Sequence, residues 1–488
     1  MEKKFYITTS IAYTNAPPHL GYALETVQAD VLARYHRALG EDVFFSTGTD
    51  EHGQKVVKAA AAAGKEPPEF TDELSSRFRS LTETLNLSND DFIRTTDQAR
   101  HWPAVRDIWL KLKEKGDIYK KKYQGLYCVG CEAFITKKDL LDGKCKIHQK
   151  EPEVIEEENY FFRLSKYSKE IGEIIKQDRV RIIPEGRKNE MLSFVEDGLE
   201  DVSFSRPSKD LKWGVPVPDD DSQTIYVWAD ALVNYISVLG YPQGEKFGKY
   251  WSADVHEVGK DILRFHSTIW LGILLSAGLP LPKTIFVHGY LTSGGQKMSK
   301  SLGNVVDPFQ LVEKYGADAV RYFLLREISP TEDGDFTEEK FRERYNSDLA
   351  NGVGNLLSRT LHLAMEIYHT DKSIFDFIKV TENKLNSTVT ETKEKYKMSL
   401  NNFAFNEALA SIWSLVSCCD KYLEEKRPWE ASPNNFEKDI ESRSVVGNVI
   451  FIIKEISKLL EPFLPNTSKR ILEQVKGQHS STLFPRLD

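Results

Sequence analysis

The chain has 488 residues, of which 40% are hydrophobic and 28% are charged, with a formal net charge of −8 and five cysteines. These values are typical of an ordinary globular protein of roughly two to four domains, and the cysteines are too few for a disulfide scaffold of this size. The negative charge argues against a protein coated in nucleic acid, although it leaves room for a local basic face. No apolar run reaches membrane length and no signal-peptide core follows Met1, so we expect a cytoplasmic protein that does not enter a membrane.

The first part of the chain alternates short apolar runs with helix-like segments. Strands are predicted at residues 5–9, 43–46, 224–228, 256–258 and 284–288. Apolar residues recur at helical spacing from Leu24 to Ala38, and Gly40 is a plausible helix stop. This alternation predicts an α/β fold with a parallel sheet, in which ligands bind beyond the carboxyl ends of the strands.

Residues suited to ligand binding follow the predicted strands. They are Ile11, Tyr13, Asp50, Trp228, Gly259, Asp261 and His288. Glycine and aspartate also collect at strand ends simply because they form turns. Because these seven residues follow all five predicted strands, we favour a ligand site at this edge of the sheet.

A segment of different character, residues 116–223, separates the two halves of the predicted sheet. It contains Cys128 and Cys131, then thirteen residues, then Cys145 and His148. This spacing can place three thiolates and one imidazole around a single tetrahedral Zn²⁺ ion, and reduced cytosolic thiols favour zinc over disulfides. We therefore predict one structural zinc site, the alternative being a set of unconnected cysteines.

Beyond about residue 330, helical periodicity dominates the sequence. Asn351, Asn355 and Arg359 stand at i, i+4 and i+8 and so share one face of a predicted helix. Trp429 follows another predicted helix, next to a basic pair. Such side chains can read unpaired RNA bases through edge hydrogen bonds and stacking. Taken singly, such residues are more often part of an ordinary helix surface, and such a tryptophan is more often buried.

Two segments are suited to binding a polyphosphate. His19 and Gly21 open a predicted helix, where a ring donor joins the backbone N–H groups. Lys297 and Lys300 lie in a loop rich in glycine and serine, and their ammonium groups can neutralise phosphate charge. Either segment alone is ordinary. Together, in this order, they resemble the two signature motifs of the class I aminoacyl-tRNA synthetases.

Four further motifs resemble one branch of that class, the methionyl-tRNA synthetases. They occupy residues 10–15, 48–53, 226–231 and 259–266, and the resemblance covers nearly the whole chain. It implies a Rossmann-type parallel-sheet catalytic domain split by a zinc-bearing connective insertion, followed by an α-helical bundle that binds the anticodon. The implied bounds are 1–115 and 224–330 for the catalytic halves, 116–223 for the insertion and 331–488 for the helical domain.

The resemblance also implies an activity. It is the ATP-dependent ligation of methionine to tRNA(Met) through a methionyl-adenylate, for translation initiation and elongation. The expected partners are methionine, ATP and tRNA(Met), and the expected cofactors are one structural Zn²⁺ ion and Mg²⁺ bound with ATP. Since no further domain follows the helical one, we expect a monomer.

A methionine side chain needs an apolar, aromatic slot with one or two weak donors. The expected methionine-binding residues are Ile11, Tyr13, Asp50, Trp228, Ala231, Tyr235, Ile262, His266 and Trp270. Among them, Tyr13 and His266 would donate to the sulfur, and Asp50 would bind the ammonium group. Ile262, His266 and Trp270 recur at i, i+4 and i+8, a spacing that an ordinary amphipathic core helix would also show.

The resemblance assigns the remaining residues to ATP and to tRNA. ATP binding is expected of His19, Gly21, Tyr22, Gly259, Asp261, His288 and Lys300, catalysis of His19, Lys297 and Lys300, and anticodon binding of Asn351, Asn355, Arg359 and Trp429. The sequence departs from the family pattern at two positions. Tyr22 replaces the usual second histidine of the first signature, and Leu232 replaces a common proline near the slot.

Three other interpretations remain open. Synthetases for leucine, isoleucine or valine would carry an inserted editing domain much larger than the segment of about 110 residues seen here. A cysteinyl enzyme would place its zinc ligands at the amino-acid pocket. A non-catalytic tRNA-binding homologue would not need His19, Asp50 and Lys300.

Overall fold

The computed structural model describes residues 3–130, 133–135, 140–147, 149–298, 303–368, 382–430, 436–477 and 481–488. The chain folds into two compact units, which are described separately. Unit 1 comprises Met1–Pro18, His36–Glu83 and Leu87–His288, and unit 2 comprises His19–Tyr35, Thr84–Asn86 and Gly289–Asp488. Across these described ranges, no helix combines the length and apolar character needed to cross a membrane.

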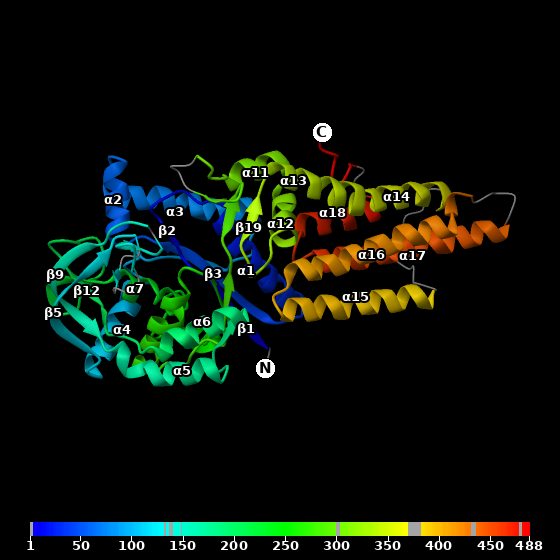
Figure 1. Ribbon diagram of the computed structural model, residues 1–488. Coiled ribbons are helices and arrows are strands. Elements are labelled where there is room, and N and C mark those ends of the chain that lie inside the picture. The colour runs from blue at the N-terminus through cyan, green and yellow to red at the C-terminus, as the bar shows by residue number, and fades with distance from the viewer. Residues whose placement is uncertain are drawn as a thin grey trace. The chain divides into compact units, whose positions relative to one another are not determined.

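Unit 1 is built on a seven-stranded parallel sheet (Figure 1). Its order is β10 (Arg181–Ile183), β16 (Thr284–His288), β15 (Val255–Gly259), β1 (Lys4–Thr9), β3 (Asp42–Asp50) and β2 (Ala12–Tyr13), with β4 (Asp91–Arg94) also paired to β3. Strands β1 and β3 are buried along nearly their whole length, as expected for a parallel sheet covered on both faces. The predicted parallel sheet is therefore confirmed, and β3 extends to Asp50.

One predicted strand of this sheet is wrong. Residues 224–228 do not continue the parallel sheet. Strand β14 (Asp220–Ile225) instead pairs antiparallel with β12 (Ser205–Pro207) and β13 (Pro216–Val217) in a separate three-stranded sheet. Asp219 adopts a left-handed φ of 66°, so the chain turns back on itself before β14. The β-branched residues Thr224 and Ile225 thus belong to an antiparallel hairpin strand. Trp228 lies in the short helix α7 (Val227–Ala231) that follows.

The connective segment has sheets of its own. The long strands β5 (Ile118–Cys128) and β9 (Glu153–Phe162) pair antiparallel, flanked by β6 (Ala133–Ile135) and β11 (Val202–Ser203). A small hairpin joins β7 (Leu140–Leu141) to β8 (Lys144–Cys145). The helices of the segment are η2 (Leu164–Tyr167), α5 (Ser168–Lys176) and α6 (Glu185–Glu196). Strand β10 lies in this part of the chain yet pairs with β16 of the parallel sheet.

Helices cover the sheet of unit 1. They are α2 (Gln54–Ala62), α3 (Pro67–Thr84), α4 (Trp102–Glu114), α7, α8 (Asn234–Ser237), α9 (Glu245–Tyr250), the π-helical segment η3 (Phe265–Trp270) and α10 (Leu271–Ala277). The core they enclose includes the fully buried rings of Tyr6, Tyr235 and Trp270.

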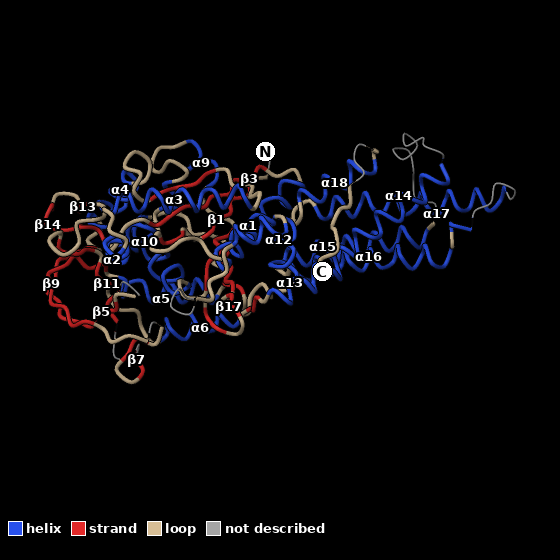
Figure 2. The backbone as a smooth tube through the Cα atoms, turned by 90° about the horizontal axis from the view of Figure 1, so that it is seen from above, coloured by secondary structure: helices blue, strands red, loops and turns tan. Residues whose placement is uncertain are grey.

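Unit 2 is mainly helical (Figure 2). It contains a small sheet of β17 (Leu291–Ser293), β18 (Gln296–Lys297) and β19 (Gly334–Phe336). Its helices are α1 (Leu20–Ala38, in this unit as far as Tyr35), α11 (Pro308–Tyr315), α12 (Ala317–Arg326), α13 (Glu338–Arg344), the π-helical η5 (Tyr345–Gly354), α14 (Asn355–Tyr368), α15 (Asn383–Asn401), α16 (Phe405–Lys426), η7 (Pro428–Glu430), α17 (Phe436–Leu460) and α18 (Pro465–Val475). Helices α15, α16 and α17 pack in succession, which confirms the predicted helical domain.

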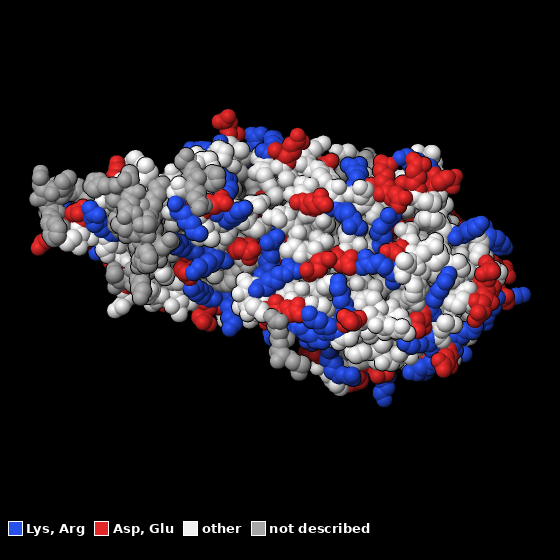
Figure 3. Space-filling view, turned by 180° about the vertical axis from the view of Figure 1, so that it is seen from behind, with Lys and Arg blue, Asp and Glu red and all other residues white. Residues whose placement is uncertain are grey.

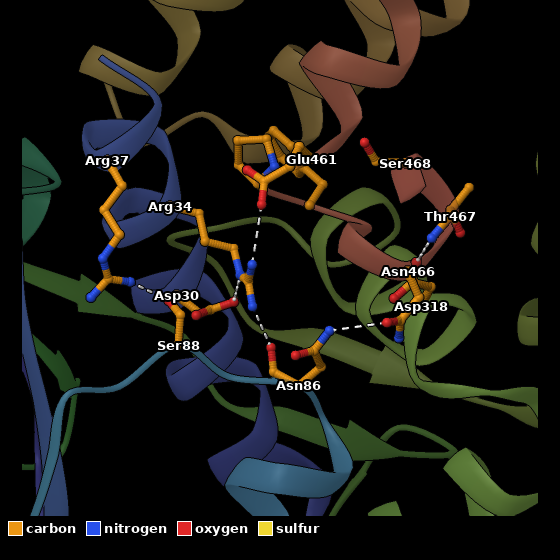
Figure 4. Close-up of polar contacts among 12 residues, drawn as sticks. Asp30, Arg34, Arg37, Asn86, Ser88, Asp318, Glu461, Asn466, Thr467 and Ser468 are labelled. Atoms are coloured by element: carbon orange, nitrogen blue, oxygen red, sulfur yellow. Dashed lines mark hydrogen bonds and ion pairs between the residues drawn. The ribbon is translucent and has the colours of Figure 1, made fainter. Parts of the chain in front are cut away.

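A buried ion-pair network fastens α1 within unit 2. Oδ2 of Asp30 lies 2.8 Å from Nε of Arg34 and 2.8 Å from Nη2 of Arg321, and both Asp30 and Arg321 are fully buried. Arg34 also donates to the carbonyl of Asn86 and to Glu461, as Figure 4 shows. Helix α1 is therefore held by charge as well as by apolar packing.

The described surface carries both signs of charge. On the face seen in Figure 3, lysine and arginine side chains are interspersed with aspartate and glutamate. This mixture agrees with the modest net charge of −8.

Candidate functional site

Asp50 and Tyr13 come together at the carboxyl edge of the sheet of unit 1. Tyr13 in β2 is paired with Asp50 in β3, and the backbone N–H of Thr14 donates to the Asp50 carbonyl over 3.0 Å. Asp50 is only 3% exposed, while Tyr13 is partly exposed. The pairing thus presents a carboxylate beside an aromatic ring.

Trp228, a predicted slot residue, forms an aromatic pair. Trp228 of α7 stacks on Phe265, with ring centroids 3.8 Å apart and planes 7° apart. Both rings are partly buried and, like Ile11, Tyr13 and Ile262, pack against the core of unit 1. Such a half-open group of apolar side chains can receive an unbranched apolar substrate.

Phe265 was not predicted. Its position in the motif at 259–266, three residues after the predicted slot residue Ile262, could have indicated it.

Two predicted slot residues, Tyr235 and His266, are joined by a buried hydrogen bond. Nδ1 of His266 donates to the Ile262 carbonyl over 2.9 Å, so its Nε2 accepts from the Tyr235 hydroxyl, 2.6 Å away. Burial lowers the pKa of His266 to about 4, against the opposing effects of the Ile262 carbonyl and Asp261, so the ring is neutral. Both ring nitrogens are engaged, and donation from His266 to a ligand would require one of these bonds to break.

The predicted helix face through Ile262, His266 and Trp270 is altered by the π-helical segment. Ile262 lies in the turn before the helix, and the wider π turn of Phe265–Trp270 shifts the side chains that follow. Trp270 is fully buried, and its Nε1 donates to Nε2 of His256 over 3.2 Å.

His256, which was not predicted, supports the slot from behind. Its Nδ1 lies 2.7 Å from Oγ1 of Thr8, and its ring lies 4.2 Å from that of Tyr235. Burial holds the pKa of His256 well below its usual range, and nearby His266 lowers it further. The neutral ring of His256 thus provides hydrogen-bond partners for the buried Thr8 hydroxyl and the Trp270 indole N–H.

The predicted nucleotide residues of unit 1 also converge. Gly259 and His288 face each other across β15 and β16. A Cβ atom on Gly259 would lie 2.8 Å from Oδ1 of Asp261 and 3.6 Å from Nε2 of His288. Only glycine leaves this corner open, and Asp261 is exposed at its mouth.

The first signature motif, in unit 2, is ordered around its histidine. The Gly21 N–H donates to Nδ1 of His19 over 3.1 Å, so the proton of the neutral ring is on Nε2. A Cβ on Gly21 would lie 2.9 Å from Cε1 of that ring, which explains the glycine. His19 is exposed, whereas Tyr22 is only 7% exposed.

The start of α1 also pairs with the segment beyond the lysine loop, through the Leu20 N–H and the Val306 carbonyl (3.3 Å). The base of that loop is fixed by Asp335 of β19, which accepts from the Thr292 hydroxyl and the Gly295 N–H, each over 2.7 Å. Burial would raise the pKa of Asp335, but these two donors lower it. Lys297 ends β18, while Lys300 lies outside the described residues.

Half of the predicted zinc ligands can be placed. Cys128 and Cys145 are 3% and 2% exposed and share a small apolar cluster with Ile135. Cys131 and His148 lie outside the described residues. Among the side chains that are described, no group of three or more potential metal ligands gathers.

Two of the predicted anticodon residues are in contact within unit 2. The Arg359 guanidinium lies 4.8 Å from the centre of the Trp429 ring, and Nη2 of Arg359 lies 2.8 Å from Oε1 of Glu424. Trp429 is 42% exposed, and Asn351 and Asn355 are exposed as well. The tryptophan is therefore a surface residue, available for stacking.

Comparison with known proteins identifies the class and then the branch. A family model described as tRNA synthetases class I (M) matches residues 5–139 and 135–361, and one described as the anticodon-binding domain of tRNA ligase matches residues 382–486. The matched residues include the parallel sheet of unit 1, which is thus that of a class I aminoacyl-tRNA synthetase.

The methionine–tRNA ligase of Thermotoga maritima is 44% identical over 478 residues, covering 97% of this chain and 75% of the relative. The chloroplastic/mitochondrial methionine–tRNA ligase of Arabidopsis thaliana is 42% identical over 96% of this chain and 77% of the relative. The chain therefore belongs to the methionine–tRNA ligase family.

A solved structure of Mycobacterium tuberculosis methionyl-tRNA synthetase in complex with methionyl-adenylate matches with a TM-score of 0.90. It is 36% identical in sequence and covers 99% of this chain and 100% of that one.

Proposed function

We infer that this chain ligates methionine to tRNA(Met) in an ATP-dependent reaction through a methionyl-adenylate. The observation that carries the inference is the 44% identity with a methionine–tRNA ligase over 97% of the chain. The geometry supports it, because an aromatic slot beside a buried carboxylate suits an amino acid with a long apolar side chain. The inserted segment, residues 116–223, is shorter than the editing domain that a leucine, isoleucine or valine enzyme would carry.

In the first step, the methionine carboxylate attacks the α-phosphate of ATP and pyrophosphate leaves. We propose that Asp50 binds the ammonium group, while Trp228, Phe265, Ile11 and Ile262 enclose the thioether. The remaining slot residues, Tyr13, Ala231, Tyr235, His266 and Trp270, would line or support the same volume. The reaction needs no covalent nucleophile from the protein, since positioning and charge stabilisation are sufficient.

The nucleotide would lie against the corner formed by Gly259, Asp261 and His288, with Asp261 on the ribose and His288 near the adenine. ATP enters as its Mg²⁺ complex. We propose that His19, which keeps a donor on Nε2, stabilises charge on the phosphates together with Lys297 and Lys300. In the second step, the terminal ribose of tRNA attacks the mixed anhydride.

Gly21 lets the backbone approach the phosphates closely. Tyr22 replaces the usual histidine, and its burial makes a supporting role more fitting than direct phosphate contact.

We propose that Cys128, Cys131, Cys145 and His148 hold a structural zinc ion. Two buried thiols that share one small cluster fit a tetrahedral site, which would stabilise the strands around this cluster. Elemental analysis of freshly purified protein should give about one zinc per chain. Cys145→Ser should lower that content, and an equal zinc content in the variant would remove Cys145 from the ligand set.

We propose that Trp429 and Arg359, with Asn351 and Asn355, bind the anticodon within a helical domain of residues 331–488. The catalytic halves, 1–115 and 224–330, and the insertion, 116–223, complete the proposed division. Trp429→Ala should lower tRNA charging by roughly ten- to a hundredfold through lost stacking and leave methionine-dependent pyrophosphate exchange unchanged. A fall in both activities would make Trp429 a structural residue. A monomeric state and a cytoplasmic location remain predictions.

The experiment that tests the function is ATP–pyrophosphate exchange with each of the twenty amino acids, followed by charging of tRNA(Met). Exchange should depend on methionine, and charging should follow with tRNA(Met). Exchange that depends on another amino acid would overturn the assignment, and no exchange with any of them would favour a non-catalytic homologue.

A further inference from the structure

Three buried side chains from distant parts of unit 1 meet in one array, which we call the His–Asp–His array. Oδ2 of Asp230, in α7, lies 2.6 Å from Nδ1 of His52, and its Oδ1 lies 2.8 Å from Nε2 of His101. His52 follows the end of β3, and His101 precedes α4. All three are at most 2% exposed. The array therefore joins three elements by two hydrogen bonds that water does not reach.

The carboxylate is the acceptor at the centre of the array. Burial alone would raise the pKa of Asp230, but the two histidines outweigh it and hold that pKa at about 2. A buried carboxylate of this kind needs donors on both oxygens, and the two imidazole N–H groups supply them. The array is thus satisfied only while both rings keep their orientation.

The array is adjacent in sequence to the residues that frame the slot. Asp230 lies two residues after Trp228, and His52 lies two residues after Asp50. Over such short stretches, the 2.6 Å bond between the two side chains fixes how far Asp50 can lie from Trp228. The other side of His101 continues the link, because its Nδ1 lies 2.8 Å from Oγ of Ser237 on α8.

The loop that carries His52 is also held by the connective segment. Nε1 of Trp213 donates to the Glu51 carbonyl over 2.6 Å, and the Gly53 N–H donates to the Trp213 carbonyl over 3.4 Å. The edge of the Trp213 ring packs on His52, with centroids 5.5 Å apart. Gly53 has a φ of 103°, which other residues rarely adopt, so the loop has one tightly defined path.

We propose that His52 and Asp230 are positioning residues, which set the separation of Asp50 and Trp228 and thereby the affinity for the amino acid without touching it. The proposal rests on the proposed roles of Asp50 and Trp228 in methionine binding. It assigns a specificity function to residues that neither signature motif contains.

Asp230→Asn tests the proposal, because the amide keeps the shape but turns an N–H group toward one imidazole donor. In ATP–pyrophosphate exchange, the KM for methionine should rise about tenfold while the KM for ATP and kcat stay within about threefold. The matched control is Asp117→Asn, another buried carboxylate of unit 1, which accepts from Tyr167 and Ser276 away from the slot. It should lower thermal stability without changing the KM for methionine.

His52 supplies a second, independent pair of variants. His52→Asn keeps an N–H donor near the position of Nδ1, whereas His52→Leu removes it. The Asn variant should bind methionine with nearly the parent KM, and the Leu variant should resemble Asp230→Asn. If the Asn and Leu variants are equally impaired, or if KM for methionine and ATP rise together, the residues are merely structural and the proposal is overturned.

Asp50→Asn separates failure of this proposal from failure of the proposed function. If that variant raises the KM for methionine and Asp230→Asn does not, only the positioning role is wrong. If Asp50→Asn leaves the KM for methionine at the parent value, the assignment of the slot itself is wrong, and the positioning role falls with it.

Discussion

Two buried aspartates, one in each unit, are held in contrasting ways. Asp30 in unit 2 lies between two guanidinium groups, those of Arg34 and Arg321. Asp230 in unit 1 lies between the imidazoles of His52 and His101. Both carboxylates are fully buried.

The difference lies in what each kind of partner can do. A guanidinium keeps its charge at any pH a protein meets and offers five donors. Arg321 uses them to bond the carbonyls of Phe463 and Pro462 as well as Asp30. An imidazole offers at most one donor per nitrogen, and each nitrogen bonds one neighbour, as His101 bonds Asp230 and Ser237. The buried aspartate of unit 2 is thus held by ion pairs that keep their charge at all relevant pH values. The buried aspartate of unit 1 is held by oriented hydrogen bonds close in sequence to the proposed slot residues.

The largest expected loss of stability comes from breaking the buried ion pair between Arg321 and Asp30. Arg321→Met leaves Asp30 buried with one partner fewer and removes the donors to three carbonyls, so it should cost about 3–5 kcal/mol of unfolding free energy. Urea denaturation, monitored by a probe in unit 2, measures this loss of unfolding free energy. The control is Arg344→Met, which breaks partly exposed pairs with Glu327 and Asp348 and should cost about 1 kcal/mol. Equal costs in the two variants would show that burial of the pair does not matter.

The second effect concerns acid. The pKa of His266 is lowered to about 4 by burial, whereas an unfolded histidine titrates at about 6.5. Between these values the unfolded chain binds a proton that the folded protein does not, so stability is lost as the pH falls from about 6.5 toward 4. The Asp230 carboxylate, with a pKa of about 2, contributes its own loss only below about 3.9.

Hydrogen exchange can localise this loss. As the pH falls toward 4, protection of amides in η3, corrected for the intrinsic pH dependence of exchange, should decrease, while that of amides around Asp30 in α1 should not, because the partners of Asp30 are guanidinium groups, which keep their charge in acid. His266→Gln should flatten the acid dependence in η3. An unchanged dependence in that variant would assign the loss to other groups, His256 first among them.

The smallest effect should come from Arg34→Lys. The ammonium group can still pair with Asp30 but cannot also reach both the Asn86 carbonyl and Glu461. We expect a loss of about 1 kcal/mol in the same urea titration. A loss as large as that of Arg321→Met would mean that the fork of Arg34, and not the burial of Arg321, dominates the network.

The sequence predicted the sheet because its strands are short apolar runs that need no distant partner to be recognised. Residues 224–228 were assigned to the wrong sheet, because β-branched residues favour an antiparallel hairpin strand as readily as a parallel strand. The slot was predicted from the motifs at 48–53 and 259–266, but the π-helical turn in η3 was not, because helical spacing alone does not reveal it.

The His–Asp–His array could not be predicted at all. Its partners lie 178 and 129 residues apart, so no local pattern joins them, although His52 and Asp230 stand in the motifs at 48–53 and 226–231.

The arginine network has a consequence for how this chain can diverge. Arg321 binds the loop between α17 and α18 through the backbone carbonyls of Pro462 and Phe463, which every residue type possesses. A substitution in that loop leaves both carbonyls in place and is limited by the packing of the buried side chains of Phe463 and Leu464, whereas an insertion or deletion of even one residue would move both carbonyls. A chimera that takes its last helices from a homologue should succeed only if the donor loop has the same length. For the contact with Arg321, loop length, and not side-chain identity, is the inherited constraint.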